Sequence, residues 1–263
     1  MPDQQDQPDQ TAASLDPATV QLQNRLAVAA KLLADVDNIG VSQDSHNIYN
    51  LIDFLVYLVD QSYPFIPCPS GCSHCCSDSG LPRTSALEWE HIHRYLREQM
   101  PGETLLRVLE RNERMHAPQL GHFLAEQQRI ENPDTELPLP DFGCRECPFL
   151  LDGRCSIYEV RPAICRGFGY FTWRPGPARD SQIFACQMAA DTLLDELRQI
   201  NAPFVALPAW NPVADKIYAL NQQLSTGTMA TLPLWLMAHS HKGQVLPLNL
   251  DPDFGQLNKP AET

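Results

Sequence analysis

The chain has 263 residues, a net charge of −13 at pH 7 and a hydrophobic content of 43%. That length is sufficient to bury a substantial core, and the hydrophobic content is ordinary for a globular protein. Nucleic-acid binding needs clustered cations that release counterions, so an acidic chain argues against a nucleic-acid partner. No run of lysine and arginine favours an anionic membrane surface either, and we expect no membrane partner.

The compartment decides how the nine cysteines are interpreted. Residues 1–10 are acidic and rich in glutamine, without the basic start and apolar stretch of a secretory signal. The longest apolar stretch, residues 48–59, contains Asn50 and Asp53 and is too short to span a bilayer. We therefore expect a cytoplasmic, reducing environment, where structural disulfides are rare and cysteines serve metal binding or redox chemistry.

The N-terminal third predicts a tail followed by two helices. Residues 1–15 are rich in Asp, Gln and Pro and predict a disordered tail. The Asp-Pro pair that follows is typical of an N-cap and a first helical position, so a helix is expected from there through Leu33. A second amphipathic helix is expected over residues 45–61, and two prolines then lead in extended form to the first cysteines.

Further helices are expected on both sides of the second cysteine group. Ser85 and Glu88 form a capping-box pattern for a helix that ends near residue 99. A long charged helix begins after Pro101 and is expected to break near Pro118, before an irregular connection at 131–141. The later helices are expected over residues 182–200 and 213–224, with a loose tail beyond 250.

Strand signals are sparse. The Asp152-Gly153 turn lies between a short apolar run and Cys155 and predicts one short β-hairpin, and residues 169–173 form a second extended run. We therefore predict a mainly α fold, a single helical domain with one irregular cysteine-rich metal-binding zone and one short β-hairpin. The predicted boundaries are 1–15 for the tail, 16–250 for the domain with its cysteine core at 64–190, and 251–263 for the C-terminal tail.

The first cysteine group places four thiols within nine positions, at Cys68, Cys72, Cys75 and Cys76. A loop of this length can wrap a small ion so that several sulfurs lie about 2.3 Å from it. The adjacent pair fits two ligands of a polynuclear cluster, or one ligand beside a reactive or core thiol. His74 lies inside the group, where it is either a ligand or a residue that faces solvent.

The second group contains Cys147, Cys155 and Cys165. Ser156 and Glu159 form another capping-box pattern, which predicts a short helix directly after Cys155. The N–H groups at the start of such a helix would stabilise a thiolate. A proline limits this helix to about one turn, so that the chain turns back and the third thiol approaches the second.

Three further features keep alternatives open. Arg161 and Arg166 either balance the charge of metal thiolates or form surface salt bridges. Cys186 falls within a predicted helix and by itself resembles a small core residue. Cys144 forms a Cys-x-x-Cys pair with Cys147, as zinc knuckles do, but the matching pair in the first group is some seventy residues away.

The order of these residues resembles the YkgJ-like cysteine-cluster family. The resemblance rests on Cys-x-x-x-Cys-x-x-Cys-Cys, then Cys-Pro-Phe-Leu, Gly-x-Cys-x-Ile-Tyr-x-x-Arg-Pro-x-x-Cys-Arg and a later Cys-Gln, over residues 68–186. The family is described as zinc- or iron-chelating and often as containing an iron–sulfur cluster. The resemblance leaves Cys144 outside the pattern and implies eight cofactor-binding metal ligands: Cys68, Cys72, Cys75, Cys76, Cys147, Cys155, Cys165 and Cys186.

Three functions are compatible with this pattern. The first is an iron–sulfur protein that transfers electrons to a redox partner or supports a redox modification. The second is a scaffold that zinc stabilises and that binds another protein without catalysis. The third is a thiol redox protein, although no thioredoxin-like βαβ pattern accompanies the Cys-x-x-Cys pairs. Neither the reaction nor the partner is indicated by the sequence.

Overall fold

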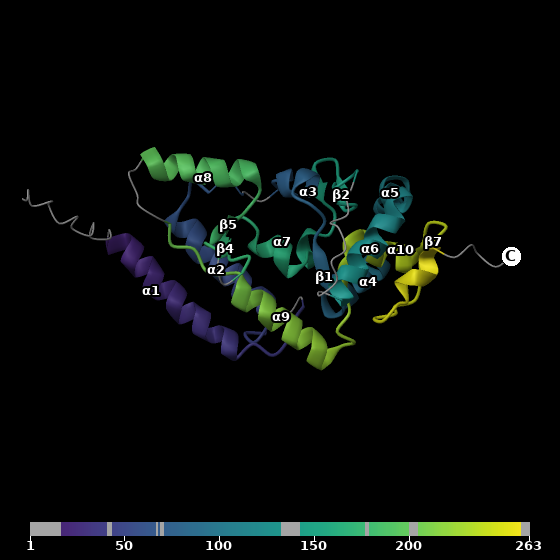
Figure 1. The fold of residues 1–263 in the computed structure, drawn as a ribbon, viewed down its shortest axis with the longest axis horizontal. Helices are drawn as coiled ribbons and strands as arrows, with labels where there is room; N and C mark the ends of the chain where they lie inside the picture. The colour runs from purple at the N-terminus through teal and green to yellow at the C-terminus, as the bar shows by residue number, and fades with distance from the viewer. Residues whose placement is uncertain are drawn as a thin grey trace, which may run out of the picture.

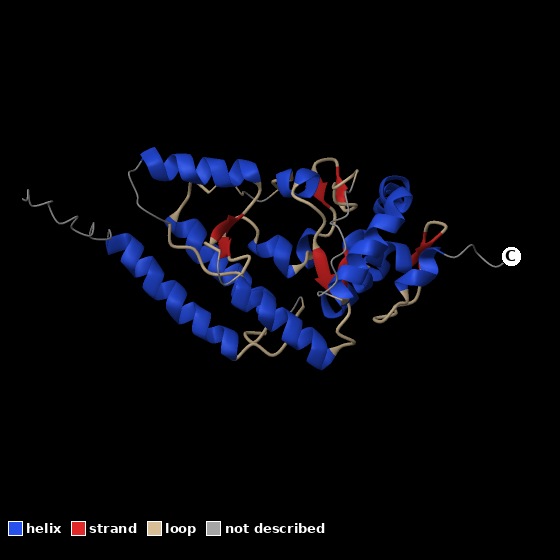
Figure 2. Cartoon of the chain, viewed as in Figure 1, coloured by secondary structure: helices blue, strands red, loops and turns tan. Residues whose placement is uncertain are grey.

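The fold is mainly α, as predicted, with only short strands (Figure 2). Among the described residues, no helix is both long and apolar enough to cross a membrane. The structure is a computed structural model, and it describes residues 17–40, 44–66, 68, 71–132, 143–176, 179–199 and 205–258. The expected tail 1–15 and most of the connection at 131–141 therefore lie outside the described residues.

Two hydrophobic cores organise the chain, and they occupy opposite ends of the molecule in Figure 1. The first core buries side chains of α1 (Pro17–Lys31), α2 (Ile48–Ser62), α7 (Ala163–Gly167), β4 (Phe171–Trp173), α8 (Gln187–Gln199) and α9 (Asn211–Leu224). The second core buries side chains of α4 (Ala86–Glu98), α5 (Gly102–His116), α6 (Leu120–Glu131), β2 (Leu150–Leu151), the 3₁₀ helix η3 (Tyr158–Val160), β6 (Met229–Thr231), α10 (Leu232–Ala238) and the 3₁₀ helix η4 (Phe254–Asn258).

The short cysteine-bearing elements lie between these ends (Figure 1). They are α3 (His74–Asp78), the β2–β3 hairpin that Arg154–Cys155 completes, and α7. Each is too short to bury an apolar face of its own, so the two larger cores fix where it lies. The cysteine-rich zone therefore lies at the junction between the two cores.

The local signals for the long helices are confirmed. Ser85 caps α4, and the reciprocal bonds of the capping box with Glu88 are both present. α2 begins after its N-cap Asn47, three residues later than the sequence predicts. The 3₁₀ helix η2 (Ala117–Gln119) interrupts the charged helix between α5 and α6, where proline removes a backbone donor. A second 3₁₀ helix, η1 (Leu32–Ala34), ends α1.

Strands are more frequent than the single hairpin that was predicted. The predicted hairpin is β2–β3, with Leu150 paired to Cys155. Three further antiparallel pairs are present: β1 (Arg83–Ser85) with β6, β4 with β5 (Gln182–Phe184), and β7 (Ser240–His241) with β8 (Gln244–Val245). The β1–β6 pair joins segments that are distant in sequence, and residues 174–181 separate β4 from β5, so a two-residue turn signal predicted neither pair.

Two predictions were wrong in detail. The helix expected over residues 182–200 begins only at Gln187, because residues 182–184 pair with β4 instead. The loose tail expected beyond residue 250 contains η4, whose Phe254 is buried against Trp235 with ring centroids 5.4 Å apart. In both places a tertiary contact overrides a weak local pattern.

Candidate metal centre

One cavity of about 560 Å³ collects the cysteines of both sequence groups. All eight thiols that the family pattern implicates line it: Cys68, Cys72, Cys75, Cys76, Cys147, Cys155, Cys165 and Cys186. Cys144 does not line it, and its backbone is held instead by the side chain of Gln119. All nine cysteines lie within the described residues, and each is a free thiol. Segments distant in sequence therefore bring their sulfur atoms to one place.

Backbone contacts join the first group to the hairpin. The N–H of Cys147 donates to the carbonyl of Cys76 at 2.7 Å, so the strand approach to β2 is anchored on α3. The hairpin then returns Cys155 to the same cavity, opposite Leu150. Asp152, with a φ of 50°, and Gly153, with a φ of 73°, form the turn.

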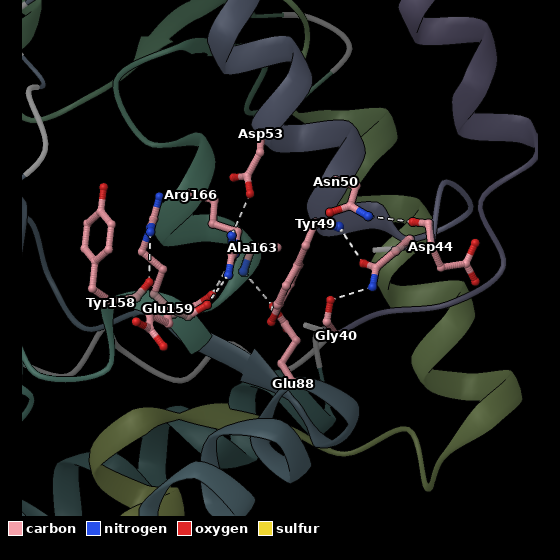
Figure 3. A network of polar contacts seen from close by, with 12 residues as sticks. Gly40, Asp44, Tyr49, Asn50, Asp53, Glu88, Tyr158, Glu159, Ala163 and Arg166 are labelled. Carbon is pink, nitrogen blue, oxygen red and sulfur yellow. Dashed lines mark hydrogen bonds and ion pairs between the residues drawn. The ribbon is translucent and has the colours of Figure 1, made fainter. Parts of the chain in front are cut away.

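α7 brings Cys165 to the cavity from the side of the first core. The carboxylate of the buried Glu88 accepts the backbone N–H of Ala163 at 2.7 Å and the hydroxyl of Tyr49 at 3.3 Å (Figure 3). The same carboxylate accepts the N–H and the hydroxyl of Ser85 at 3.0 and 2.8 Å. One side chain therefore ties α4 of the second core to α2 and α7 of the first.

Cys186 reaches the cavity because of β5. The pairing of β4 with β5 ends two residues before Cys186, so this thiol precedes α8 and does not lie within it. The hydroxyl of Tyr170 donates to the carbonyl of Cys68 at 2.8 Å. Gly169 has a φ of +97°, and a Cβ there would lie 2.4 Å from the sulfur of Cys68. Cys68 and Cys186 are thus held by the same strand pair.

The sulfur atoms line the cavity without meeting at a single point. The Sγ atoms of Cys75 and Cys76 are 3.9 Å apart. Four sulfurs on one tetrahedral ion with bonds of about 2.3 Å are about 3.8 Å from one another. Among the described residues, however, no group of three or more Cys, His, Asp or Glu side chains is converged on one ion. Binding a metal therefore requires these thiols to turn toward the cavity centre.

The surroundings raise the pKa of several of these thiols, among them Cys68 and Cys76. Burial raises the pKa of Cys68 to about 12, and the neighbouring Cys186, Cys72 and Cys75 add to this effect. A hydrogen bond with Cys147 is the largest of the effects that together raise the pKa of Cys76 to about 12. Buried thiolates without a counter-charge are costly. A metal ion supplies that charge and deprotonates coordinating thiols, so these donors suit a thiophilic metal.

The two arginines that follow Cys155 have different roles. Arg166 is buried, donates to Asp53 at 2.8 Å and to the carbonyl of Glu159 at 2.6 Å, and lies 4.2 Å from the centre of the Tyr49 ring (Figure 3). It holds α2 against α7. Arg161 lies over the ring of Tyr158 at 3.8 Å, and both arginines line the cavity.

Cys155 is the thiol that Arg161 affects. Burial raises the pKa of the Cys155 thiol, while the N–H of Ile157 and the positive charge of Arg161 lower it. Of the two roles left open for the arginines, charge balance therefore fits Arg161 and an ion pair fits Arg166.

The short helix predicted after Cys155 is present as the single 3₁₀ turn η3, but its predicted cap is wrong. Ser156 makes no cap, and its hydroxyl donates to the carbonyl of Phe149 at 3.0 Å. Cys155 itself lies in β3, and only the single turn of η3 follows it. The capping pattern does not form a cap here because the Ser156 hydroxyl makes its hydrogen bond within the hairpin segment instead. A backbone N–H, that of Ile157, still reaches the sulfur.

A second cavity of about 190 Å³ adjoins the first. Cys75, Cys76, Cys147 and Cys165 line both cavities. The remaining lining of the second is mostly apolar: Ser79, Gly80, Leu81, Pro82, Ile164, Phe168 and Phe184. These four cysteines therefore lie between the two cavities.

Sequence reasoning missed one side of the large cavity. Asp53, Tyr57 and Asp60 of α2 line it, although the sequence analysis used only the apolar face of that helix. Their spacing of four and three residues places them on one helical face, which was the available signal. His74 is exposed and does not line the cavity, so the solvent-facing alternative fits it.

Comparison with known proteins identifies a family match within the chain. Residues 67–177 match the model of the CxxCxxCC family, described as a "putative zinc- or iron-chelating domain". No curated protein and no solved structure matches the chain significantly. The matched range contains seven of the eight cysteines that line the cavity, and Cys186 lies beyond it. Beyond the matched range, the shared cavity associates Cys186 with the others.

Proposed function

Because residues 67–177 belong to the CxxCxxCC family of zinc- or iron-chelating domains, we propose that this chain binds an iron–sulfur cluster and uses it in electron transfer or another redox reaction. The observation that supports this is the lining of one cavity by eight free thiols. A mononuclear ion accepts four thiolates, and a site with eight exceeds what one zinc ion can use. Reduced thiols in this number also favour a reducing, cytoplasmic compartment.

The surroundings of the thiols suit a redox centre. The donors would be the eight cavity cysteines, and a bound cluster would accept and release single electrons. Ile157, Phe168 and Tyr170 line the cavity and limit access of water. Low polarity, N–H donation to sulfur and a nearby positive charge all tune the reduction potential of such a centre. The N–H of Ile157 and the guanidinium of Arg161 provide the last two.

The rim of the cavity offers a route to a partner. Tyr57 and Tyr158 are 55% and 42% exposed, and both line the cavity. Electron-transfer partners form small and transient contacts, for which aromatic and arginine side chains at an opening are suited. We propose that a redox protein docks over these two tyrosines.

Zinc is the second candidate. The separation of 3.9 Å between the sulfurs of Cys75 and Cys76 is close to the edge of a tetrahedral zinc–thiolate site. In that case the metal would stabilise the junction between the two cores, and the chain would act as a scaffold for another protein.

Purification without oxygen distinguishes the candidates. We expect a brown protein that absorbs near 400 nm, with iron and acid-labile sulfide in stoichiometric amounts. A colourless protein with stoichiometric zinc would contradict the iron–sulfur proposal and support the scaffold. A protein that binds neither metal and forms reversible disulfides would contradict both.

A further inference from the structure

The eight thiols of the cavity are not equivalent, because the elements that hold them differ. Five are joined by the contacts described next, and we call them the inner cysteines: Cys75, Cys76, Cys147, Cys155 and Cys165. We call the other three the outer cysteines: Cys68, Cys72 and Cys186.

Direct contacts connect the inner cysteines to one another. Cys147 belongs to the second core, and Cys76 and Cys155 pack against that core. The N–H of Cys147 donates to the carbonyl of Cys76, and the sulfurs of Cys75 and Cys76 are 3.9 Å apart. Cys165 shares the apolar second cavity with Cys75, Cys76 and Cys147. These contacts bring five sulfurs to the inner end of the large cavity.

The outer cysteines are held by different elements. Cys68 packs against the first core, and its sulfur lies against Gly169. The N–H of Gly169 donates to the carbonyl of Phe184 at 2.7 Å, and Cys186 follows two residues later. Cys72 lies four residues after Cys68 in the same loop. None of the three lines the apolar second cavity.

We propose that the large cavity holds two separate metal centres, one on the inner cysteines and one on the outer cysteines. This inference rests on the proposed metal-binding function and is independent of whether the metal is iron or zinc. The inner set can supply four thiolates, as a closed structural centre needs, with one thiol to spare. The outer set supplies three, which leaves one coordination position for a small exogenous ligand, as in a reactive centre.

The rim residues fit this division of roles. Tyr57 and Asp60 of α2 line the cavity, and Tyr170 fixes the carbonyl of Cys68. Four of the five inner cysteines instead line the second cavity as well. The outer centre, with three thiolates, is therefore the one that has a position for a small exogenous ligand, and the inner centre is the one that joins the two cores.

Counting the metal centres on each chain tests the partition. Full-length wild-type protein and cysteine-to-alanine variants are purified without oxygen, and native mass spectrometry with elemental analysis gives the number of centres. We expect two centres in wild-type protein and in Cys144→Ala, the control thiol outside the cavity. Cys72→Ala and Cys186→Ala should each lose the outer centre alone. Because the inner set has a spare thiol, the triple variant Cys76→Ala, Cys147→Ala and Cys165→Ala, which leaves two inner thiols, should lose the inner centre alone.

The outcomes separate this inference from the proposed function. Wild-type protein without metal would overturn both. Wild-type protein with one centre, or with all metal lost in both classes of variant, would overturn the partition and leave the function intact. If loss of the inner centre unfolds the chain, the outer variants still test the partition, because each of them must retain one of the two centres. Cyanide should change the visible spectrum of wild-type protein, or of its Co²⁺ form if the metal is zinc, but not that of Cys186→Ala.

Discussion

The cysteine cavity and the histidine–tryptophan cluster of the second core both contain side chains of types that bind metals in other proteins. The two regions differ in the hydrogen-bond partners that the fold gives to these side chains. Trp89 and Trp235 stack with centroids 5.6 Å apart, and the rings of His93 and His239 lie 5.4 Å apart beside them. His239 contacts the carbonyl of Trp235 at 2.9 Å and both backbone groups of Asn249 at 2.9 and 3.0 Å.

The cavity thiols lie mainly against one another. The sulfurs of Cys75 and Cys76 are 3.9 Å apart, and Cys147 is the largest cause of the raised pKa of Cys76. Buried polar groups that are satisfied by the backbone need nothing further, whereas crowded thiols gain from a cation. This difference shows why the cysteines, and not His93 and His239, mark the candidate metal site: the backbone already provides polar partners for these two histidines, whereas the crowded thiols can still bind a cation.

Removal of the metal should produce the largest difference in stability between the cysteine cavity and the histidine–tryptophan cluster. A metal present at about a thousand times its Kd stabilises the native state by about 4 kcal/mol. We expect the apoprotein to lose protection from hydrogen exchange in α3, the β2–β3 hairpin and α7, while α4 and α10 remain protected. Equal loss in both regions would show that the second core does not fold independently of the centre.

The Glu88 carboxylate joins the two cores, and its removal should have the second-largest effect on stability. Glu88→Ala leaves the N–H of Ala163 and the groups of Ser85 without their acceptor. We expect a loss of about 3 kcal/mol in the free energy of unfolding, measured with urea. The control is Glu90→Ala, which removes only an exposed pair with Arg94 and should cost about 0.5 kcal/mol or less.

Acid should weaken the second core through His116. Burial lowers the pKa of His116 to about 4, below the value of about 6.5 in an unfolded chain. The unfolded state therefore binds the proton first, and stability present above pH 6.5 is lost as the pH falls toward 4. Between pH 6.5 and 5 the loss should be about 2 kcal/mol. His116→Phe should remove this dependence, and exposed His122→Gln should retain it.

The contact between Gly169 and Cys68 can be tested with two alanine substitutions. Gly169→Ala introduces both a positive-φ strain and a clash with the Cys68 sulfur, for a cost of about 2 kcal/mol. Gly153→Ala has a φ of +73° but nothing within 4 Å, so it reports the strain alone. Only Gly169→Ala should also lower the metal content. A similar metal content in both variants would show that Cys68 is not a ligand.

Arg161 should have the smallest effect. Its charge favours the thiolate of Cys155, so Arg161→Gln should weaken metal binding by about tenfold, or roughly 1.4 kcal/mol, in a competition with a chelator. Arg154→Gln is the control, since Arg154 lies beside Cys155 on β3 but does not line the cavity. Equal affinities for both variants would contradict a role for Arg161 in charge balance.

Local sequence signals predicted the long helices because their information lies within a few residues. The capping box of Ser85 and Glu88 and the break before α6 are examples, and the Asp152-Gly153 turn predicted the hairpin. The same reasoning failed at Ser156, whose hydroxyl bonds to Phe149, and at residues 182–184, which pair with β4. In these places the deciding partner is not the nearest neighbour in sequence.

The sequence by itself determined that this protein is mainly α and that seven of the eight cavity cysteines lie in the range that matches the family, because spacing and residue type are local properties. Only the tertiary structure decided that Cys186 shares a cavity with Cys68 and that Arg166 belongs to an ion pair while Arg161 faces a thiol. Those outcomes depend on how the two cores pack around the short elements that carry the cysteines. No short element carries that information, since its position comes from the packing of others.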